Sequence, residues 1–158
     1  MNTFSTKRTI IAGIISGIAV NIAGFFTFAL LGMGLNFNGI LLRPGLQNEK
    51  IIAVWKTLEP LPLAVTAPVV IALGYLLLAV VYAFVYRWIA PVMPQGIKAR
   101  ALRISLFFIT TFLFWELNTP INLFSEPFPL AALDVLYFII MACAGAFAMA
   151  WAFERRRK

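Results

Sequence analysis

Four long runs of apolar residues limit most strongly what this chain can fold into. They cover residues 9–35, 61–89, 101–124 and 130–153. A helix needs about 20 apolar residues to cross the hydrocarbon core of a membrane, which is roughly 30 Å thick. Each run is long enough, and only 12% of the residues are charged. We therefore expect a single membrane domain over residues 1–158, with four transmembrane helices.

Basic residues flank these runs unevenly, which predicts the orientation of the chain. Arg43, Lys50 and Lys56 lie in one connection, and the other ten basic residues lie at helix ends that share a side with the N-terminus. These ten are Lys7, Arg8, Arg87, Lys98, Arg100, Arg103, Arg155, Arg156, Arg157 and Lys158. Because Lys and Arg accumulate on the cytoplasmic side, we expect both termini in the cytoplasm and a multi-pass protein of the bacterial cytoplasmic (inner) membrane. The net charge of +7 then indicates contact with anionic membrane lipids and not with nucleic acid.

A short internal repeat precedes the second and fourth runs. Residues 59–64 are Glu-Pro-Leu-Pro-Leu-Ala, and residues 126–131 are Glu-Pro-Phe-Pro-Leu-Ala. Both copies start an outward-to-inward helix, so we interpret the chain as two helical hairpins in the same orientation, related by a pseudo-two-fold axis along the membrane normal. The expected fold class is an all-α membrane protein, an up-down four-helix bundle of two parallel-repeat hairpins.

The first hairpin carries an outer loop, residues 36–60, that the second hairpin lacks. Within it, residues 49–58 place apolar side chains on one helical face and polar ones on the other. This pattern predicts a short amphipathic helix lying in the membrane interface, with Trp55 as its anchor. A helix that docks onto a partner protein is the alternative. We expect the function to depend on this insertion.

One face of the first predicted span is small or polar. Gly13, Gly17, Asn21 and Gly24 follow one another at helical spacing, and the first two form a GxxxG motif that lets another backbone approach closely. We expect this face to pack inside the bundle, with a homo-oligomer interface as the alternative. Asn21 is expected to make an interhelical hydrogen bond.

Four polar residues near the outer ends of the last two spans are the candidate ligand or ion site. Glu116, Asn118 and Asn122 end the third span, and Asp134 begins the fourth. An acid within a membrane span indicates a functional site by default, here one that handles protons or cations. The alternative is a helix end at the interface, where these residues cap backbone groups and pair with basic residues of the outer loop. Pro120 is expected to break the third helix.

Several kinds of chemistry are excluded by composition. The chain has no histidine and one cysteine, Cys143, so imidazole metal sites, His-ligated haem and intramolecular disulfides are ruled out. It also has no glycine-rich phosphate loop and no catalytic motif of the common hydrolase or metalloprotease families. We therefore predict no catalytic residue, no metal and no cofactor, and leave open a bound lipid or pigment.

The order of these features resembles that of small bacterial integral membrane proteins with four spans. The matching features are the basic start at Lys7 and Arg8, the glycine-bearing first span, Gly74, and the inner turn with Pro91 and Pro94, followed by Glu116 and Asn118 at the end of the third span. The resemblance implies the fold and no activity.

Three functions are compatible with this sequence. The first is a non-enzymatic accessory or scaffolding subunit of a larger membrane complex. The second is a small oligomeric transporter or channel, coupled to protons or other cations through Glu116. The third is a lipid-modifying enzyme that uses Glu116 with Asp134, which would need a polar cavity reaching both carboxylates.

Overall fold

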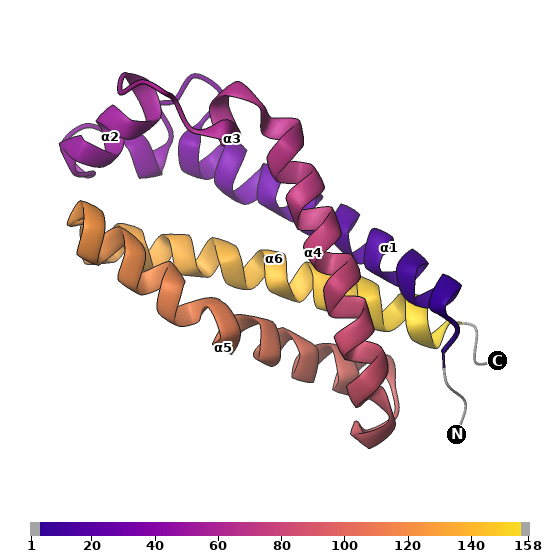
Figure 1. Ribbon diagram of the computed structural model, residues 1–158. Helices are drawn as coiled ribbons and strands as arrows, with labels where there is room; N and C mark the ends of the chain where they lie inside the picture. The colour runs from indigo at the N-terminus through magenta and orange to yellow at the C-terminus, as the bar shows by residue number, and fades with distance from the viewer. Residues whose placement is uncertain (1–3, 156–158) are drawn as a thin grey trace.

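The computed structural model describes residues 4–155, and every regular element in that range is a helix (Figure 1). The α-helices are α1 (Thr6–Gly24), α2 (Glu49–Lys56), α3 (Leu63–Thr66), α4 (Pro68–Ile89), α5 (Ile97–Phe124) and α6 (Phe128–Glu154). A π-helix, η1 (Phe25–Met33), continues α1 directly, and two short 3₁₀ helices are η2 (Ile40–Leu42) and η3 (Ala90–Val92). The all-helical class expected from the sequence is confirmed for this part of the chain.

Three helical segments are long and apolar enough to cross a membrane: Thr6–Met33, Pro68–Val92 and Phe128–Glu154. They support the prediction of a membrane protein. α5 has 28 residues but is not among the three. The fourth span expected over residues 101–124 therefore stays a prediction.

The second membrane helix begins later than expected. The sequence predicted it from residue 61, but α3 is a separate short helix and α4 begins at Pro68. Ala67 between them has φ −147° and ψ 60°, outside the helical region. Proline disfavours helical geometry in the residue before it and has no N–H of its own, so Pro68 starts a helix well but cannot continue one without cost.

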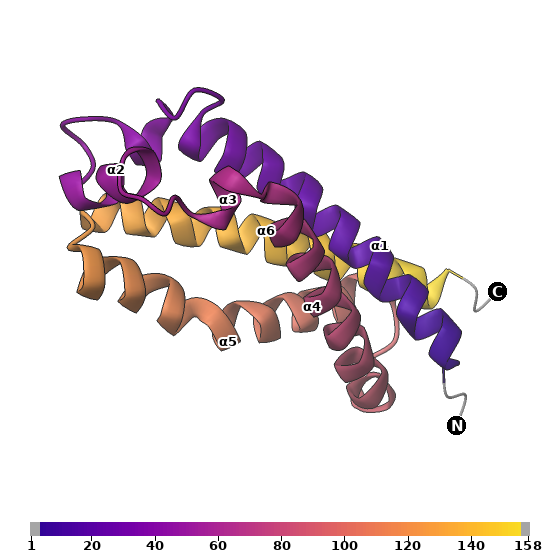
Figure 2. The same cartoon turned by 45° about the horizontal axis from the view of Figure 1, so that its top comes forward.

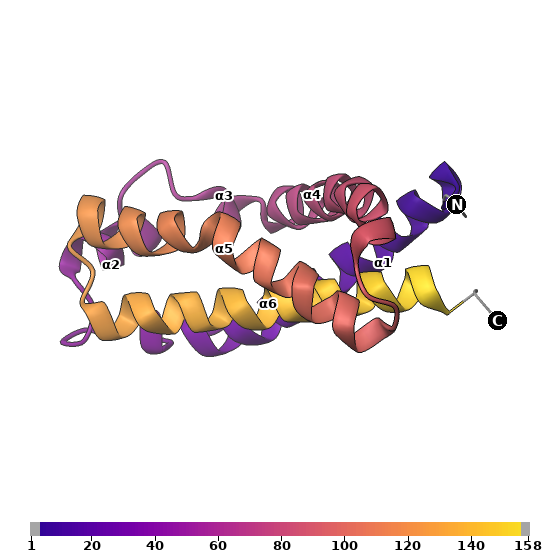
Figure 3. The ribbon, with the colours of Figure 1, turned by 90° about the horizontal axis from the view of Figure 1, so that it is seen from below.

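The long helices form two pairs, α1 with α4 and α5 with α6, and the pairs contact each other through α1 and α6. α1 packs along both α4 and α6, and α5 packs along α6 (Figures 1 and 2). The start of α1, the end of α6 and the connection between α4 and α5 lie at one end of the molecule, which we call the terminal end. α2 and the connection between α5 and α6 lie at the opposite end, the cavity end (Figures 1 and 3). Each pair joins two long helices that are consecutive in the chain, and the predicted internal repeat stays a prediction.

The terminal end is tightly packed. The rings of Tyr86 and Phe153 stack with centroids 4.5 Å apart and planes 7° apart. Arg100 is buried there; its guanidinium donates to the carbonyl oxygens of Ala90 and Pro94 and pairs with the Glu154 carboxylate. These bonds tie the α4–α5 connection to the end of α6. Of the residues counted in the basic cluster at this end, Arg156, Arg157 and Lys158 lie outside the described residues.

The small-residue face of α1 packs against neighbouring helices of the same chain. A methyl group added at Gly13 would lie 2.5 Å from the Cα of Val80, and one at Gly17 would lie 2.8 Å from the Cα of Leu76. The Asn21 side chain donates to the carbonyl oxygen of Ala72 at 3.1 Å, which links α1 to α4. Gly24 faces Met141 of α6 instead.

The expected break at Pro120 does not occur. α5 runs through this residue and ends at Phe124, where Ser125 adopts left-handed geometry with φ 53°. Pro120 lies near the end of the helix, so its missing N–H removes a hydrogen bond only from the last turns. The carbonyl oxygen of Pro120 accepts from the Glu126 N–H at 3.2 Å, which closes the helix end.

Candidate functional site

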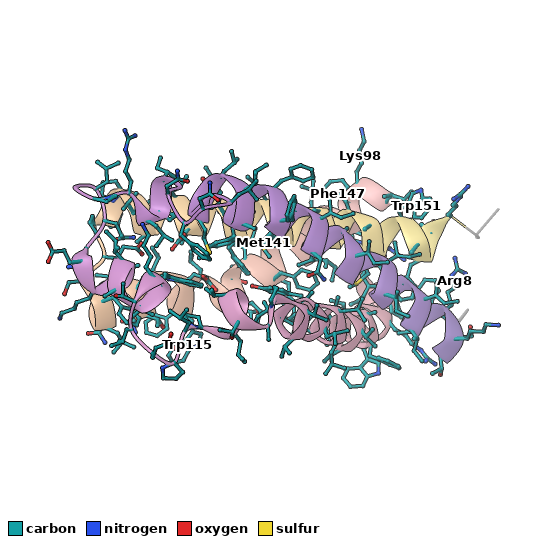
Figure 4. The ribbon with its side chains drawn as sticks, turned by 90° about the horizontal axis from the view of Figure 1, so that it is seen from above. Arg8, Lys98, Trp115, Met141, Phe147 and Trp151 are labelled. Atoms are coloured by element: carbon teal, nitrogen blue, oxygen red, sulfur yellow. The ribbon has the colours of Figure 1, made fainter. Side chains whose placement is uncertain are left out.

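A cavity of about 570 Å³ occupies the cavity end of the molecule. Residues from α1, η1, η2, α2, α3 and α4 form one side, and residues from α5, α6 and their connection form the other. Most of the lining is apolar. The exceptions are Asn21, Gln47, Tyr75, Glu116, Glu126 and Asp134. Met141, which lies near the middle of the molecule (Figure 4), is at the inner end of the cavity.

Three carboxylates line this cavity from three successive parts of the chain. Glu116 is the one lining residue from α5, Glu126 comes from the α5–α6 connection, and Asp134 comes from the first part of α6. The chain has six acidic residues in total, so half of them meet here. The negative charges of Glu126 and Glu116 both act on Asp134, Glu126 more strongly.

Glu126 is the most buried of the three, with only 6% of its surface exposed. Its Oε1 accepts a hydrogen bond of 2.6 Å from the side-chain N–H of Gln47. Its Oε2 is buried and has no hydrogen-bond partner within residues 4–155. Burial raises the pKa of Glu126, and the hydrogen bond from Gln47 partly offsets that shift. Burying a carboxylate oxygen without a hydrogen-bond partner costs free energy. A hydrogen-bond donor or a positive charge placed in the cavity would lower that cost.

Asp134 has the same feature, since its Oδ1 is buried without a hydrogen-bond partner among the described residues. One arrangement expected from the sequence pairs these acids with the basic residues of the outer loop, which are Arg43, Lys50 and Lys56. That pairing does not form: none of the three basic residues lines the cavity, and the ion pair found between described residues is the one at the terminal end. Among the described residues, the three acids therefore line the cavity with no basic side chain in the same lining.

The loop before α2 holds the Glu126 side of the cavity in place. Gln47 is itself buried, and its Oε1 accepts from the backbone N–H of Asn48 at 2.8 Å. The Asn48 side chain caps the start of α2 by accepting from the N–H of Lys50. Because its amide is fixed on the oxygen side, Gln47 presents its N–H to Glu126.

α2 covers the cavity with its apolar face. The helix occupies Glu49–Lys56, where the sequence predicts an amphipathic helix. Ile51 and Trp55 on its apolar side line the cavity. The amphipathic pattern of this segment is therefore matched by an apolar surface within the chain itself. Its predicted position in the membrane interface, with Trp55 as anchor, stays a prediction.

The π-helix η1 also contributes to the cavity lining. Phe25 and Phe28 of this segment line the cavity, and the ring of Phe28 packs edge-on against Tyr137 of α6 with centroids 5.5 Å apart. A π-helix has a wider backbone than an α-helix, and such segments occur often at functional sites. Here the π-helical segment follows Asn21 and Gly24 of α1, which line the same cavity.

A second, much smaller cavity of about 50 Å³ continues toward the terminal end. Tyr75 and Met141 line both cavities and separate them. Tyr82 and Phe108 form part of the small cavity, with ring centroids 4.4 Å apart. Beyond Phe108 the interior is filled by the packed core of the terminal end.

The structure brings together only part of the predicted site. Glu116 and Asp134 line one cavity, whereas Asn118 and Asn122 do not line it. Asn21 and Gly24, predicted as packing residues, line the cavity as well as packing. The sequence analysis missed Glu126.

Gln47 was missed too. The sequence does mark Glu126, because this residue opens the second copy of the repeat. The repeat by itself indicates an architecture and not a site. No local feature of the sequence marks Gln47, because its hydrogen-bond partner Glu126 is 79 positions away.

The described residues contain no group of three or more His, Cys, Asp or Glu side chains placed to hold a metal ion. The three acids thus line a common space without converging on one point. Comparison of the chain with protein-family models, with curated proteins and with solved structures finds no match.

Proposed function

We propose that this protein is a four-span membrane protein that binds a cation in the acidic cavity and carries it across the membrane. The single observation that supports this most strongly is the set of three carboxylates around one cavity with no basic side chain in its lining. The chain carries thirteen Lys and Arg residues against six acidic ones. An acidic cavity free of bases is therefore not a consequence of average composition.

Electrostatics explains why the cavity would attract a cation. Removing a carboxylate from water costs several kcal/mol unless an opposite charge or hydrogen bonds replace the water. Protons can neutralise the three acids when the cavity is empty, and a positively charged ligand can do so when it is full. A site that exchanges protons for a cation in this way can couple the movement of one to the movement of the other.

The position of the cavity fits transport. The proposed orientation puts the terminal end in the cytoplasm and the cavity end outside. The cavity would then be the outward-facing site, and the packed core around Tyr86 and Phe153 would close the inner end. The small cavity behind Tyr75 and Met141 marks where a path through the bundle would continue.

Two other functions rank below this one. An accessory subunit would use apolar outer faces of the helices to contact partners, but those faces are equally suited to lipid. A lipid-modifying enzyme would use Glu116 and Asp134, and the cavity does reach both. Its lining, within residues 4–155, holds no Ser, Thr, Cys or Lys to act as a nucleophile.

Cation flux in proteoliposomes tests the proposal. We expect Glu116→Gln and Asp134→Asn to lower flux about tenfold or more while the purified protein elutes as the wild type does. Asn118→Ala and Asn122→Ala are matched controls, because they alter polar residues of α5 that do not line the cavity. Wild-type flux in both acid variants would contradict the proposal.

Purification from native membranes separates the proposal from the accessory role. We expect the protein to migrate alone or as a small homo-oligomer. Migration with larger subunits at fixed stoichiometry, together with no flux by the wild type, would favour the accessory-subunit function.

A further inference from the structure

We infer that the cavity binds a lipophilic organic cation, such as a quaternary ammonium or phosphonium compound with an aromatic or branched alkyl body, and not a bare metal ion. This inference rests on the proposed function and names its substrate class. Three features of the cavity support it: its size, its aromatic side chains and an acidic set that comes from other elements than those side chains.

The size of the cavity fits an organic molecule. Binding sites for small organic ligands have volumes of about 300–1,000 Å³, and this cavity has about 570 Å³. A metal ion such as Ca²⁺ needs about six to eight oxygen ligands at one point. The acids of the described residues form no such cluster, so they suit a charge that is spread over a larger body.

Four aromatic side chains line the cavity together with the acids. Phe25 and Phe28 come from η1, Trp55 from α2 and Tyr75 from α4. The faces of aromatic rings attract organic cations, and cages of such rings are the usual way in which proteins bind quaternary ammonium groups. These rings also offer an apolar surface to the body of the ligand.

The acids and the aromatic residues of the cavity come from different elements. The three carboxylates come from α5, α6 and their connection, whereas the aromatic residues come from η1, α2 and α4. An organic cation would therefore place its charged centre toward Asp134 and Glu126 and its body toward Phe28 and Trp55. The unpartnered and buried Oε2 of Glu126 is the atom that most needs such a charge.

The α5 side of the cavity suits a ligand that dissolves in lipid. All buried residues of α5 lie between Arg100 and Phe108, so the second half of the helix, which packs mainly on α6, has no buried residue. Trp115 is 61% exposed and points away from the molecule (Figure 4). Only Glu116 of this half helix reaches the cavity. A lipophilic cation that partitions into the membrane meets this thin wall.

Equilibrium dialysis of the full-length protein in mild detergent tests the inference. The probes are tetraphenylphosphonium, the uncharged triphenylphosphine oxide, Rb⁺ and Ca²⁺. We expect tetraphenylphosphonium to bind much more tightly than the other three. Trp55→Ala is expected to weaken its binding about tenfold through loss of ring contacts, and Asp134→Asn through loss of charge.

Two control variants and a folding check accompany these measurements. Trp115→Ala removes an exposed tryptophan outside the cavity, and Glu59→Gln changes the exposed acid that opens the first repeat; both should bind as the wild type does. Phe28→Leu keeps the cavity apolar but removes a ring, so it replaces Trp55→Ala if that variant does not elute as a single species.

The outcomes separate the two proposals. Binding of Rb⁺ or Ca²⁺ that depends on Asp134, with no binding of tetraphenylphosphonium, would overturn the organic-cation inference and leave the proposed function standing. Equal binding of the charged and the uncharged probe would also overturn the inference. No Asp134-dependent binding of any cation, combined with no flux in proteoliposomes, would overturn both.

Discussion

Gln47 donates a hydrogen bond of 2.6 Å to Glu126, although the two residues are 79 positions apart. Both side chains are 6% exposed. The bond joins the loop before α2 to the connection between α5 and α6. It therefore holds α2, which lines the cavity with Ile51 and Trp55, close to the connection that carries Glu126. It also satisfies one oxygen of Glu126 and leaves the other for a ligand.

Replacing Gln47 should destabilise the protein at the cavity end. Gln47→Ala leaves both oxygens of Glu126 without a protein donor, and a buried unsatisfied acceptor costs about 1–3 kcal/mol. We expect the free energy of unfolding in detergent, measured by chemical denaturation, to fall by that amount. Gln95→Ala, at an exposed position of the α4–α5 connection, is the control. Equal stability of the two variants would argue against the bond.

The stability contributed by Glu126 should fall as pH rises. Burial raises the pKa of Glu126 in the folded protein, so the fold holds this proton more tightly than the unfolded chain does. The contribution is complete below the pKa of the unfolded chain, about 4.3, and is lost as pH rises through the higher folded pKa.

Glu126→Gln isolates this effect, because it keeps an acceptor for Gln47 but does not titrate. We expect the wild type to lose unfolding free energy relative to this variant as pH rises above about 4, the pKa range of the unfolded chain. Chemical denaturation of both proteins across this range measures the difference. Because the charge of Glu126 also acts on Asp134, the difference between the two pH profiles reports the titration of Glu126 together with that coupling. Parallel pH profiles would contradict the prediction.

Adding a single methyl group at Gly13 should weaken the packing of α1 on α4. Its Cβ would lie 2.5 Å from the Cα of Val80, and backbone cannot move as a flexible side chain can. Overpacking of this kind costs about 1–3 kcal/mol. Gly74→Ala is the matched control, because nothing lies within 4 Å of a Cβ at that position, and it should be neutral or stabilising by up to about 1 kcal/mol. Thermal unfolding in detergent distinguishes the two.

Removing Arg100 should destabilise the terminal end more than removing a neighbouring arginine. Arg100 is 3% exposed and forms an ion pair with Glu154 and two bonds to carbonyl oxygens. Loss of one partner of a buried pair costs about 3–5 kcal/mol. Arg103→Ala, at an exposed position of the same helix, should change the unfolding free energy little. A similar loss in both variants would show that charge number, and not this pair, matters.

The sequence predicted the two acids that the structure brings together because their spacing is symmetric. Glu116 lies nine residues before Ser125 and Asp134 nine after it, and the turn at Ser125 places both beside one cavity. The asparagines were assigned to the same site although helix geometry argues against it. Asn118 is two residues from Glu116, about 200° around a helix of 3.6 residues per turn, and so points elsewhere.

Other features could not be derived from local sequence. Amphipathicity predicted a helix with one apolar face within residues 49–58, and the structure has this helix over Glu49–Lys56. The pattern could not predict which apolar surface that face covers. The two copies of the repeat have nearly the same sequence but different surroundings. Glu59 is exposed and accepts from the N–H of Leu61, whereas Glu126 is buried beside Gln47. Tertiary packing, and not the motif, decides which copy carries a site.

Labelling with dicyclohexylcarbodiimide, a reagent for carboxyl groups in apolar surroundings, tests the central claim most directly and requires no variant. Mass spectrometry of the labelled wild-type protein would locate the modified residues. We predict modification at Glu116, Glu126 or Asp134 but not at the exposed Glu49 and Glu59, and protection of the modified residue by a saturating cation. Absence of label from all three cavity acids, or label that neither tetraphenylphosphonium, Rb⁺ nor Ca²⁺ reduces, would contradict a cation-binding cavity.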